Sequence, residues 1–223
     1  MKRTANARMA AMLAALIVPL LGLVLLVHAG FAAAQACGSL QNGYGPFDYR
    51  HAVGDQVSIV EKYHFDTDVE QLRHGLTSYV GGDLSYTLRA VPNHPRALWA
   101  MVRLSRKEHT EKPQGSEYTV ACWFDRATRF APDDGEVRLL YGLWLTNIGK
   151  KSEAAQQLDM ARKLIGSSDR LKNDGNMAYN LGLGFFDVGR YDDAVAMAKR
   201  AHELGFPMNG LENKLRRANK WPG

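Results

Sequence analysis

Two segments of the chain share one spacing of small residues, and this internal repeat limits the possible folds more than any other feature. The segments are 141–161 and 181–201, and their spacing is identical. In each copy a glycine is followed by two alanines: Gly142, Ala154 and Ala161 in the first, Gly182, Ala194 and Ala201 in the second. Repeats with a period of about 20 to 50 residues are typical of architectures in which similar units stack.

The second copy has the periodicity of two helices. Apolar residues recur at i, i+3, i+4 and i+7 on either side of Gly189, which separates the two stretches. The segment 205–207, Gly-Phe-Pro, carries the usual signals for the end of a helix. Each copy therefore predicts an antiparallel helix pair, with Gly and Ala at the points of closest approach.

This pattern resembles the tetratricopeptide repeat, which has a Leu-Gly pair, two later alanines and a terminal proline. Leu181-Gly182 and Pro207 match it, and 189–194 has the Gly-x-Tyr-x-x-Ala form of its turn. An earlier copy is visible in Ala127 and Pro132. The resemblance implies an all-α fold, a right-handed superhelical array of antiparallel helix pairs ending in a capping helix.

The resemblance, together with the pattern of the N-terminus described below, divides the chain into four parts. We expect a leader at 1–36, an irregular segment at 37–67, repeats at 68–210 and a capping helix and tail at 211–223. Within the repeats we expect helices at 94–106 and at 211–218, and a degenerate helix pair at 68–75 and 83–90, split by Gly81-Gly82. An insertion at 165–174 would explain why the two copies are 40 residues apart rather than about 34.

The N-terminus has the pattern of a secretory signal peptide. Lys2, Arg3 and Arg8 precede an apolar stretch at 9–27, and Ala34-Gln35-Ala36 offers a cleavage site. The apolar stretch approaches the ~20 residues that span a bilayer, so an uncleaved anchor in the inner membrane is an alternative. Lipidation of Cys37 is a third. Each places the remainder of the chain in the periplasm.

Charge and cysteine content agree with an exported protein. The net charge is +5, but without the three leader cations there are 25 basic against 23 acidic residues, a net charge of +2. No concentrated basic footprint for nucleic acid is therefore expected. Cys37 and Cys122 are the two cysteines, and an oxidising compartment favours a disulfide between them over a buried free thiol at Cys122.

The sequence contains no motif that indicates catalysis. A phosphate-binding loop, a dinucleotide-binding turn, a nucleophile elbow and a His-Glu-x-x-His metal site are all absent. His64 and Asp68 could meet across a turn, which is a weak basis for a catalytic pair. We therefore expect no catalytic residue, no metal and no cofactor.

In tetratricopeptide folds the first helix of each pair lines a concave groove. The resemblance therefore implies a partner-binding groove formed by Arg96, Trp99, Arg103, Arg106, Leu139, Leu143, Asn147, Tyr179, Asn180, Leu183 and Phe186. Leu139 and Leu143 stand where a carboxylate-clamping member would carry Lys and Asn, which argues against a clamp. Trp and Arg commonly anchor interfaces, although Trp99 as a core residue beside a solvated arginine face is equally compatible.

The segment 43–50, Gly-Tyr-Gly-Pro-Phe-Asp-Tyr-Arg, is rich in glycine and aromatic residues. Either it caps exposed apolar surface with its aromatic rings or it is a docking strap for a partner, and the cap is favoured.

These features predict a periplasmic scaffold or adaptor that binds an envelope protein or peptide through the groove, with membrane contact only if 1–36 is retained. The alternatives are a module binding a small molecule or sugar in an aromatic pocket around Trp99 and Trp144, or a membrane-anchored assembly subunit. The sequence sets no oligomeric state.

Overall fold

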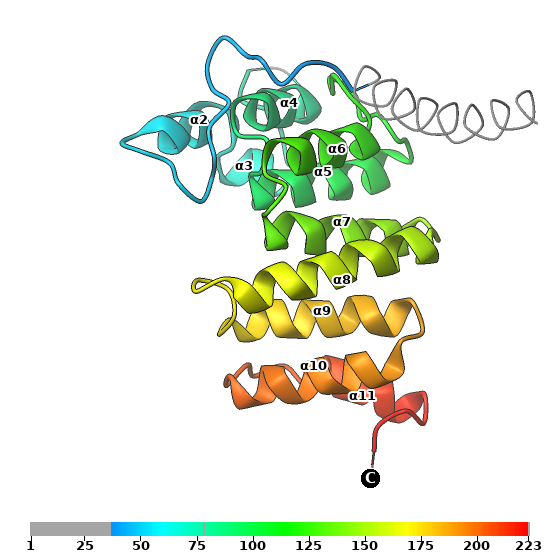
Figure 1. Ribbon diagram of the computed structural model, residues 1–223. Coiled ribbons are helices and arrows are strands. Elements are labelled where there is room, and N and C mark those ends of the chain that lie inside the picture. Colours follow the sequence, from blue (N-terminus) through cyan, green and yellow to red (C-terminus); the bar gives the residue numbers. More distant parts are fainter. Residues whose placement is uncertain (1–36, 78, 223) are drawn as a thin grey trace, which may run out of the picture. The chain divides into compact units, whose positions relative to one another are not determined.

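The computed structural model describes residues 37–77 and 79–222, and all the regular elements in these ranges are helices. The predicted leader, anchor and cleavage site at 1–36 lie outside the described residues, apart from Cys37 itself. The chain divides into two units, 1–39 and 40–223, and the fold described below is that of the second unit (Figure 1). Its helices are α2 (Gln56–His64), α3 (Thr67–Glu70), α4 (Val80–Ala90), α5 (Pro95–Glu108), α6 (Val120–Phe130), α7 (Gly135–Asn147), α8 (Lys151–Ser167), α9 (Gly175–Asp187), α10 (Tyr191–Glu203) and α11 (Gly210–Arg217).

The repeat seen in the sequence appears as successive helix pairs. Helices α5, α7 and α9 begin 40 residues apart. Each begins after a residue whose side chain accepts backbone N–H groups of the first turn: His94, Asp134 and Asp174 respectively. Helix α7 packs against α8, and α9 against α10 (Figure 1). The prediction of an all-helical fold built from such pairs is confirmed, whereas a right-handed superhelix stays a prediction.

The glycines of the repeat lie at close contacts between helices, as the pattern predicts. A Cβ atom added to Gly142 of α7 would lie 2.8 Å from the side chain of Leu158 on α8. One added to Gly182 of α9 would lie 3.1 Å from Cβ of Met197 on α10. Any side chain at these two positions would push the paired helices apart.

The segment 37–67 is not irregular throughout, and this prediction was wrong. It contains α2, which packs against α4. Val60 of α2 is buried with Ala90 and Val91 and is flanked by Val57. Two valines three residues apart supply the contact, a signal too short to stand out as a periodic helix.

The predicted degenerate pair differs in both of its helices. The first shrinks to the single turn of α3, and Leu72 beyond it has a left-handed backbone, with φ of 58°. Gly81-Gly82 lies inside α4 rather than between helices. A Cβ on Gly81 would lie 2.3 Å from the backbone oxygen of Gln114. Because Gly81 has no side chain, the loop between α5 and α6 can pack directly against α4.

The other expected boundaries fare better. The predicted helices at 94–106 and 211–218 correspond to α5 and α11 within two residues. The expected insertion at 165–174 is helical in its first part, because α8 continues to Ser167.

Cys37 and Cys122 are joined by a disulfide, as predicted. Over residues 37–77 and 79–222, no helix is long and apolar enough to cross a membrane.

The segment 43–50 packs as a cap. The backbone N–H of Phe47 donates to the carbonyl oxygen of Ala90 at 2.8 Å, and the rings of Phe47 and Tyr49 pack on the cluster of Val60, Ala90 and Val91. This arrangement supports the cap over the docking strap.

A polar cluster holds the same segment in place. The amide of Asn93, which is fully buried, donates to Asp48 at 2.8 Å and to Asp134 at 2.9 Å, and accepts from the backbone N–H of Tyr49 at 2.9 Å. Arg50 pairs with Asp48 at 2.7 Å. Burial alone would raise the pKa of Asp48, but hydrogen bonds from Arg50 and Asn93 outweigh it and lower that pKa to about 2.

We expect Gly81→Ala to lower the free energy of unfolding by about 1–3 kcal/mol, because the new methyl group meets backbone that cannot rotate away. Gly166→Ala is the matched control, because Gly166 lies in α8 with open space around its Cβ position. There the higher helix propensity of alanine should raise the free energy of unfolding by roughly 0.5–1 kcal/mol. Urea unfolding of both variants measures the difference. Equal stability of the two would contradict the close contact.

We expect Asp48→Asn to change how stability depends on acid. The folded-state pKa of about 2 lies below the ordinary 3.8, so the unfolded chain binds the proton more tightly. The carboxylate therefore contributes about 2 kcal/mol above pH 4, and this contribution is lost as the pH falls towards 2. The variant should lose part of this pH dependence in denaturant titrations between pH 2 and 5. Asp192→Asn, on the exposed side of α10, should keep it.

Candidate functional site

A groove crosses the first helices of three successive pairs. It has a volume of about 290 Å³ and is formed by α5, α7 and α9, together with Glu70 at the end of α3. The residues lining it are Glu70, Pro95, Arg96, Trp99, Arg103, Glu136, Leu139, Leu140, Leu143, Asn176, Met177 and Asn180.

The floor of the groove is apolar and belongs to the protein core. Leu139 and Met177 are buried, and Trp99 and Leu143 are half-buried. Trp99 packs against the core around α4–α6, whereas Leu143 packs against the core around α8–α10. The floor therefore joins two hydrophobic clusters and leaves part of an indole and part of a leucine facing solvent, a pattern that suits apolar side chains of a ligand.

The arginine at one end of the groove is neutralised within the chain. Arg96 pairs with Glu61 at 2.5 Å and with Glu70 at 2.9 Å. Burial alone would lower the pKa of Arg96, but the hydrogen bond to Glu61 and the charge of Glu70 raise it. Two carboxylates around one guanidinium leave no net positive charge at this end.

His94 completes this cluster from the interior. Its Nδ1 accepts the backbone N–H of Ala97 at 3.2 Å, so the proton of the neutral ring is assigned to Nε2, which lies 3.0 Å from Glu61. Burial lowers the pKa of His94. A neutral His94 thus orients Glu61 towards Arg96 without adding charge.

The second arginine keeps its charge. Arg103 donates from its terminal nitrogen to the backbone oxygen of Glu70 at 2.5 Å, and this acceptor is neutral. Across the groove, burial raises the pKa of Glu136, which lies 3.3 Å from Arg170. Asn176 and Asn180 are hydrogen-bonded to each other at 2.9 Å. The rim therefore offers amides, a paired carboxylate and one guanidinium that has no carboxylate partner in the part of the chain that the structure describes.

The groove contains six of the residues expected from the sequence: Arg96, Trp99, Arg103, Leu139, Leu143 and Asn180. The other five, which do not line it, are Arg106, Asn147, Tyr179, Leu183 and Phe186. Arg106 lines an adjacent depression, and Asn147 is exposed at the end of α7. Leu183 and Phe186 pack against the hydrophobic core around α8–α10.

Tyr179 is a core residue. It is buried with its ring 4.9 Å from that of Phe206, and its hydroxyl lies where a Cβ on Gly210 would come within 2.6 Å. Glu136 and Asn176, which the register of the repeats also places in the groove, line it as well. Sequence reasoning missed Glu70, Pro95, Leu140 and Met177, because Glu70 lies outside the regular repeats and the others lie one position away from the expected stripe.

His64 and Asp68 do not pair, which corrects that expectation. Nδ1 of His64 lies 2.9 Å from Asp83, which is fully buried and also accepts hydrogen bonds from Leu76 and Thr77. Asp68 instead pairs with Arg73 at 2.6 Å and His74 at 3.2 Å. The buried Asp83 thus anchors a loop. In the part of the chain that the structure describes, no three His, Cys, Asp or Glu residues are arranged to hold a metal ion.

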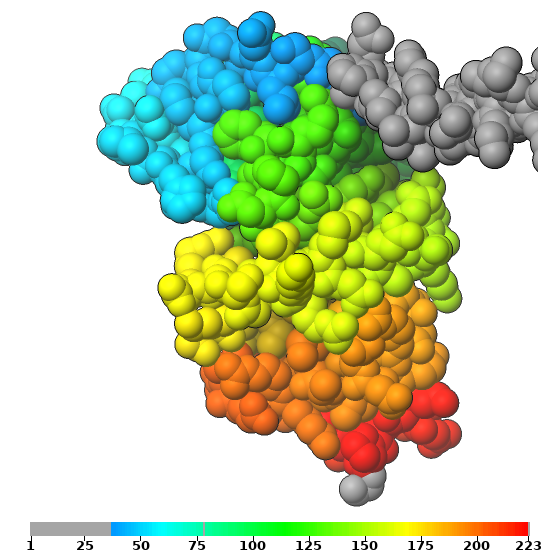
Figure 2. Space-filling model, in the orientation of Figure 1, coloured from blue at the N-terminus to red at the C-terminus, as the bar shows by residue number. Residues whose placement is uncertain are grey.

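A separate hollow of about 400 Å³ lies among α8, α9 and α10, with an apolar lining that includes Leu171, Ala178 and Met197. Figure 2 shows the surface indented between the yellow region, which ends α8, and the orange α10. Arg162, Lys172 and Arg200 at its edge each pair with a carboxylate of the chain, Asp193, Asp169 and Glu203 respectively. The groove over α5, α7 and α9 is the better candidate because Arg103 there has no carboxylate partner among the described residues.

Comparisons with known proteins identify no family. No family model and no curated protein matches the chain. A solved structure titled "MamA MSR-1 C2" shares 15% sequence identity, over 71% of this chain and 80% of that one, with a TM-score of 0.40. A likeness at this level carries no argument about fold or function.

We expect Tyr179→Ala to lower the free energy of unfolding by about 3 kcal/mol, because it empties a buried aromatic site. The same variant should bind a groove ligand normally at temperatures where it is folded, since its side chain does not line the groove. Thermal unfolding and a binding titration separate the two effects. Weaker binding with unchanged stability would indicate that Tyr179 contacts the ligand, as the sequence predicted.

Proposed function

We propose that this protein is a periplasmic scaffold that binds a protein or peptide of the cell envelope through the groove over α5, α7 and α9. The observation that carries the proposal is the groove itself, with its apolar floor of Trp99, Leu139 and Leu143 and its polar rim. Apolar pockets give affinity to such sites, and polar groups at the edge orient the ligand.

The shape of the site favours a chain-like ligand. Its lining comes from three helices in succession, so contacts are spread along a line rather than around one point. Helix pairs of this kind, as in the tetratricopeptide array that the sequence resembles, offer extended surfaces of this type. An extended segment of a partner would lay side chains into the floor while its backbone meets Asn176 and Asn180.

The compartment is inferred from two features. The disulfide between Cys37 and Cys122 is compatible with an oxidising environment. The N-terminal pattern of three cations, an apolar stretch and a small-residue cleavage site is that of an exported chain. Together they support the periplasm, either as a cleaved protein or as a membrane-anchored assembly subunit. The mass of the mature chain distinguishes these two forms.

The rival function, binding of a sugar or other small molecule, depended on an aromatic pocket around both Trp99 and Trp144. Trp144 does not line the groove, and its ring stacks on Phe124 and Tyr141 at 5.6 and 5.8 Å. Among the described residues that line the groove, Trp99 is the one with an aromatic side chain. This arrangement favours the scaffold.

A photo-crosslinking amino acid placed in the groove tests the proposal. At Leu143 or Asn180 it should capture one discrete envelope protein in living cells, and at Lys199, an exposed residue of α10, it should not. Trp99→Ala combined with the crosslinker at Asn180 should reduce capture several-fold, because the floor loses its largest apolar surface.

The same experiment has a clear contrary result. Equal capture from Leu143 and from Lys199 would indicate non-specific contact, and capture only from Lys199 would move the interface to α10. As a matched control, Ile148→Gln removes an exposed apolar residue just beyond α7 and should leave capture unchanged, whereas Leu143→Gln should reduce it.

A further inference from the structure

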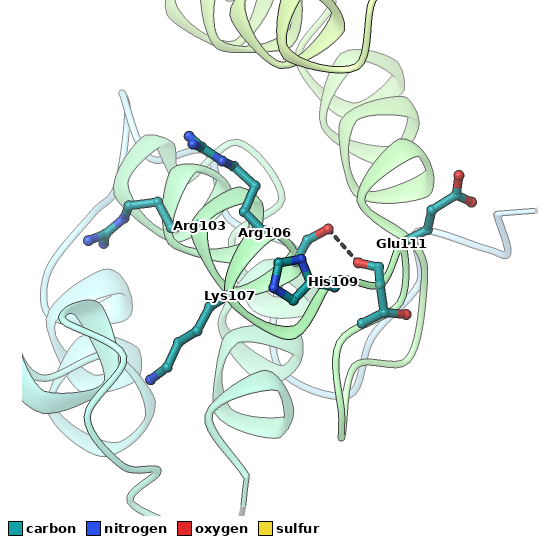
Figure 3. A pocket seen from close by; sticks show the side chains of 7 residues that line it. Arg103, Arg106, Lys107, His109 and Glu111 are labelled. Carbon is teal, nitrogen blue, oxygen red and sulfur yellow. Dashed lines mark hydrogen bonds between the residues drawn. The ribbon is translucent and has the colours of Figure 1, made fainter.

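A basic depression adjoins the groove at the C-terminal end of α5. It is lined by Arg103, Arg106, Lys107, His109 and Glu111, together with Ser105 and Thr110, and has a volume of about 650 Å³ (Figure 3). In Figure 3 the side chains of Arg103, Arg106 and Lys107 spread outward from α5 on the side of the view opposite Glu111.

The cations of this depression are not neutralised by the carboxylates near them. Arg103 donates to the backbone oxygen of Glu70 at 2.5 Å, and Lys107 to that of Leu72 at 2.8 Å. Both acceptors are neutral, so neither bond offsets the positive charge of its donor. Arg106 is exposed and, within the described residues, its side chain has no hydrogen bond or ion pair. Glu111 is the one carboxylate among the described lining residues. Three full positive charges on two turns of one helix attract an anion.

Stabilisation of the helix end accounts for only part of this cluster. Arg106 and Lys107 stand in the last turn of α5, where cations favour the helix dipole. Arg103 lies a turn earlier, and its guanidinium reaches over to α3 rather than to the carbonyl groups that end α5. Its position is better explained by the surface it forms.

Arg103 connects the two surfaces, since it lines both the groove and the depression. Trp99, Arg103 and Arg106 follow one another at helical spacing along one side of α5. At about 1.5 Å per residue, Arg106 lies roughly 10 Å along the helix from Trp99. An extended peptide advances about 3.3 Å per residue, so it covers this distance in about three residues.

We propose that the ligand of the groove is an acidic peptide segment with a defined register. An apolar side chain rests on Trp99 and Leu143, and a carboxylate about three residues away lies over Arg103 and Arg106. This inference rests on the proposed function and adds the chemistry of the ligand to it. The opposite end of the groove does not attract a second acid, because Arg96 is already held by Glu61 and Glu70.

The test selects ligands without assuming their identity. A phage library of random twelve-residue peptides is selected on the full chain, and in parallel on Arg106→Glu and on Arg217→Glu. The second variant makes the same change at an exposed arginine of α11, far from the groove in sequence and with no carboxylate partner in the described chain. Thermal melts of the two variants verify that both are folded.

The proposal expects selected peptides with an apolar residue and an acid about three positions apart, retained by Arg217→Glu and lost with Arg106→Glu. Changing that acid to its amide should weaken binding about fivefold on the wild-type chain. On Arg106→Gln the same change should have less than about half of that effect, because the partner charge is gone.

The other outcomes separate the two proposals. Apolar peptides without an acid, lost with Trp99→Ala, would overturn the acidic register but leave the groove as a peptide site. Acidic peptides lost equally with Arg217→Glu would indicate net charge alone and overturn the inference. No enrichment over bare resin would count against both the inference and the proposed function.

Discussion

The side chain of Leu158 lies between two glycines, and the arrangement of the C-terminal half depends on this contact. A Cβ on Gly142 of α7 would lie 2.8 Å from Leu158, and one on Gly184 of α9 would lie 2.6 Å from it. Leu158, on α8, is fully buried, so one residue sets the distance between two successive first helices. Leu143 and Asn180 reach the groove from those same two helices, and the width of the groove therefore follows from packing on its far side.

At the N-terminal end of the unit, the hydrogen bonds of one buried polar residue, Asn93, hold neighbouring segments together. Asn93 uses both amide hydrogens and its oxygen to join Asp48, Asp134 and the backbone of Tyr49, so its hydrogen-bonding capacity is satisfied although it is buried. Asp134 also begins α7 by accepting backbone N–H groups. The glycine-rich N-terminal segment is thereby held against the turn before α5 and the turn before α7, where hydrophobic packing alone would leave its backbone groups without partners.

The arginines of α5 show how residues of one type on one helix acquire different roles. Arg96 is held by two carboxylates, Arg103 by a neutral carbonyl oxygen, and Arg106 projects into solvent. Their spacing predicts a shared face, but their availability to a ligand depends on Glu61 and Glu70, which come from α2 and α3. The electrostatic character of the groove therefore changes along its length, from no net positive charge beside Arg96 to positive beside Arg103.

The sequence by itself determined the features that local chemistry controls. Glycine and alanine spacing predicted the paired helices, the capping helix at the end was expected, and two cysteines predicted the disulfide. The tertiary structure alone decided what depends on partners distant in the chain. Helix α2 was missed because two valines are too few to show a helical period. Tyr179 is a core residue rather than a groove residue because α11 covers it. Gly81 lies within α4 because the loop between α5 and α6 passes over it. Each of these residues has its role set by contacts 26 or more positions away, and no local pattern reports such contacts.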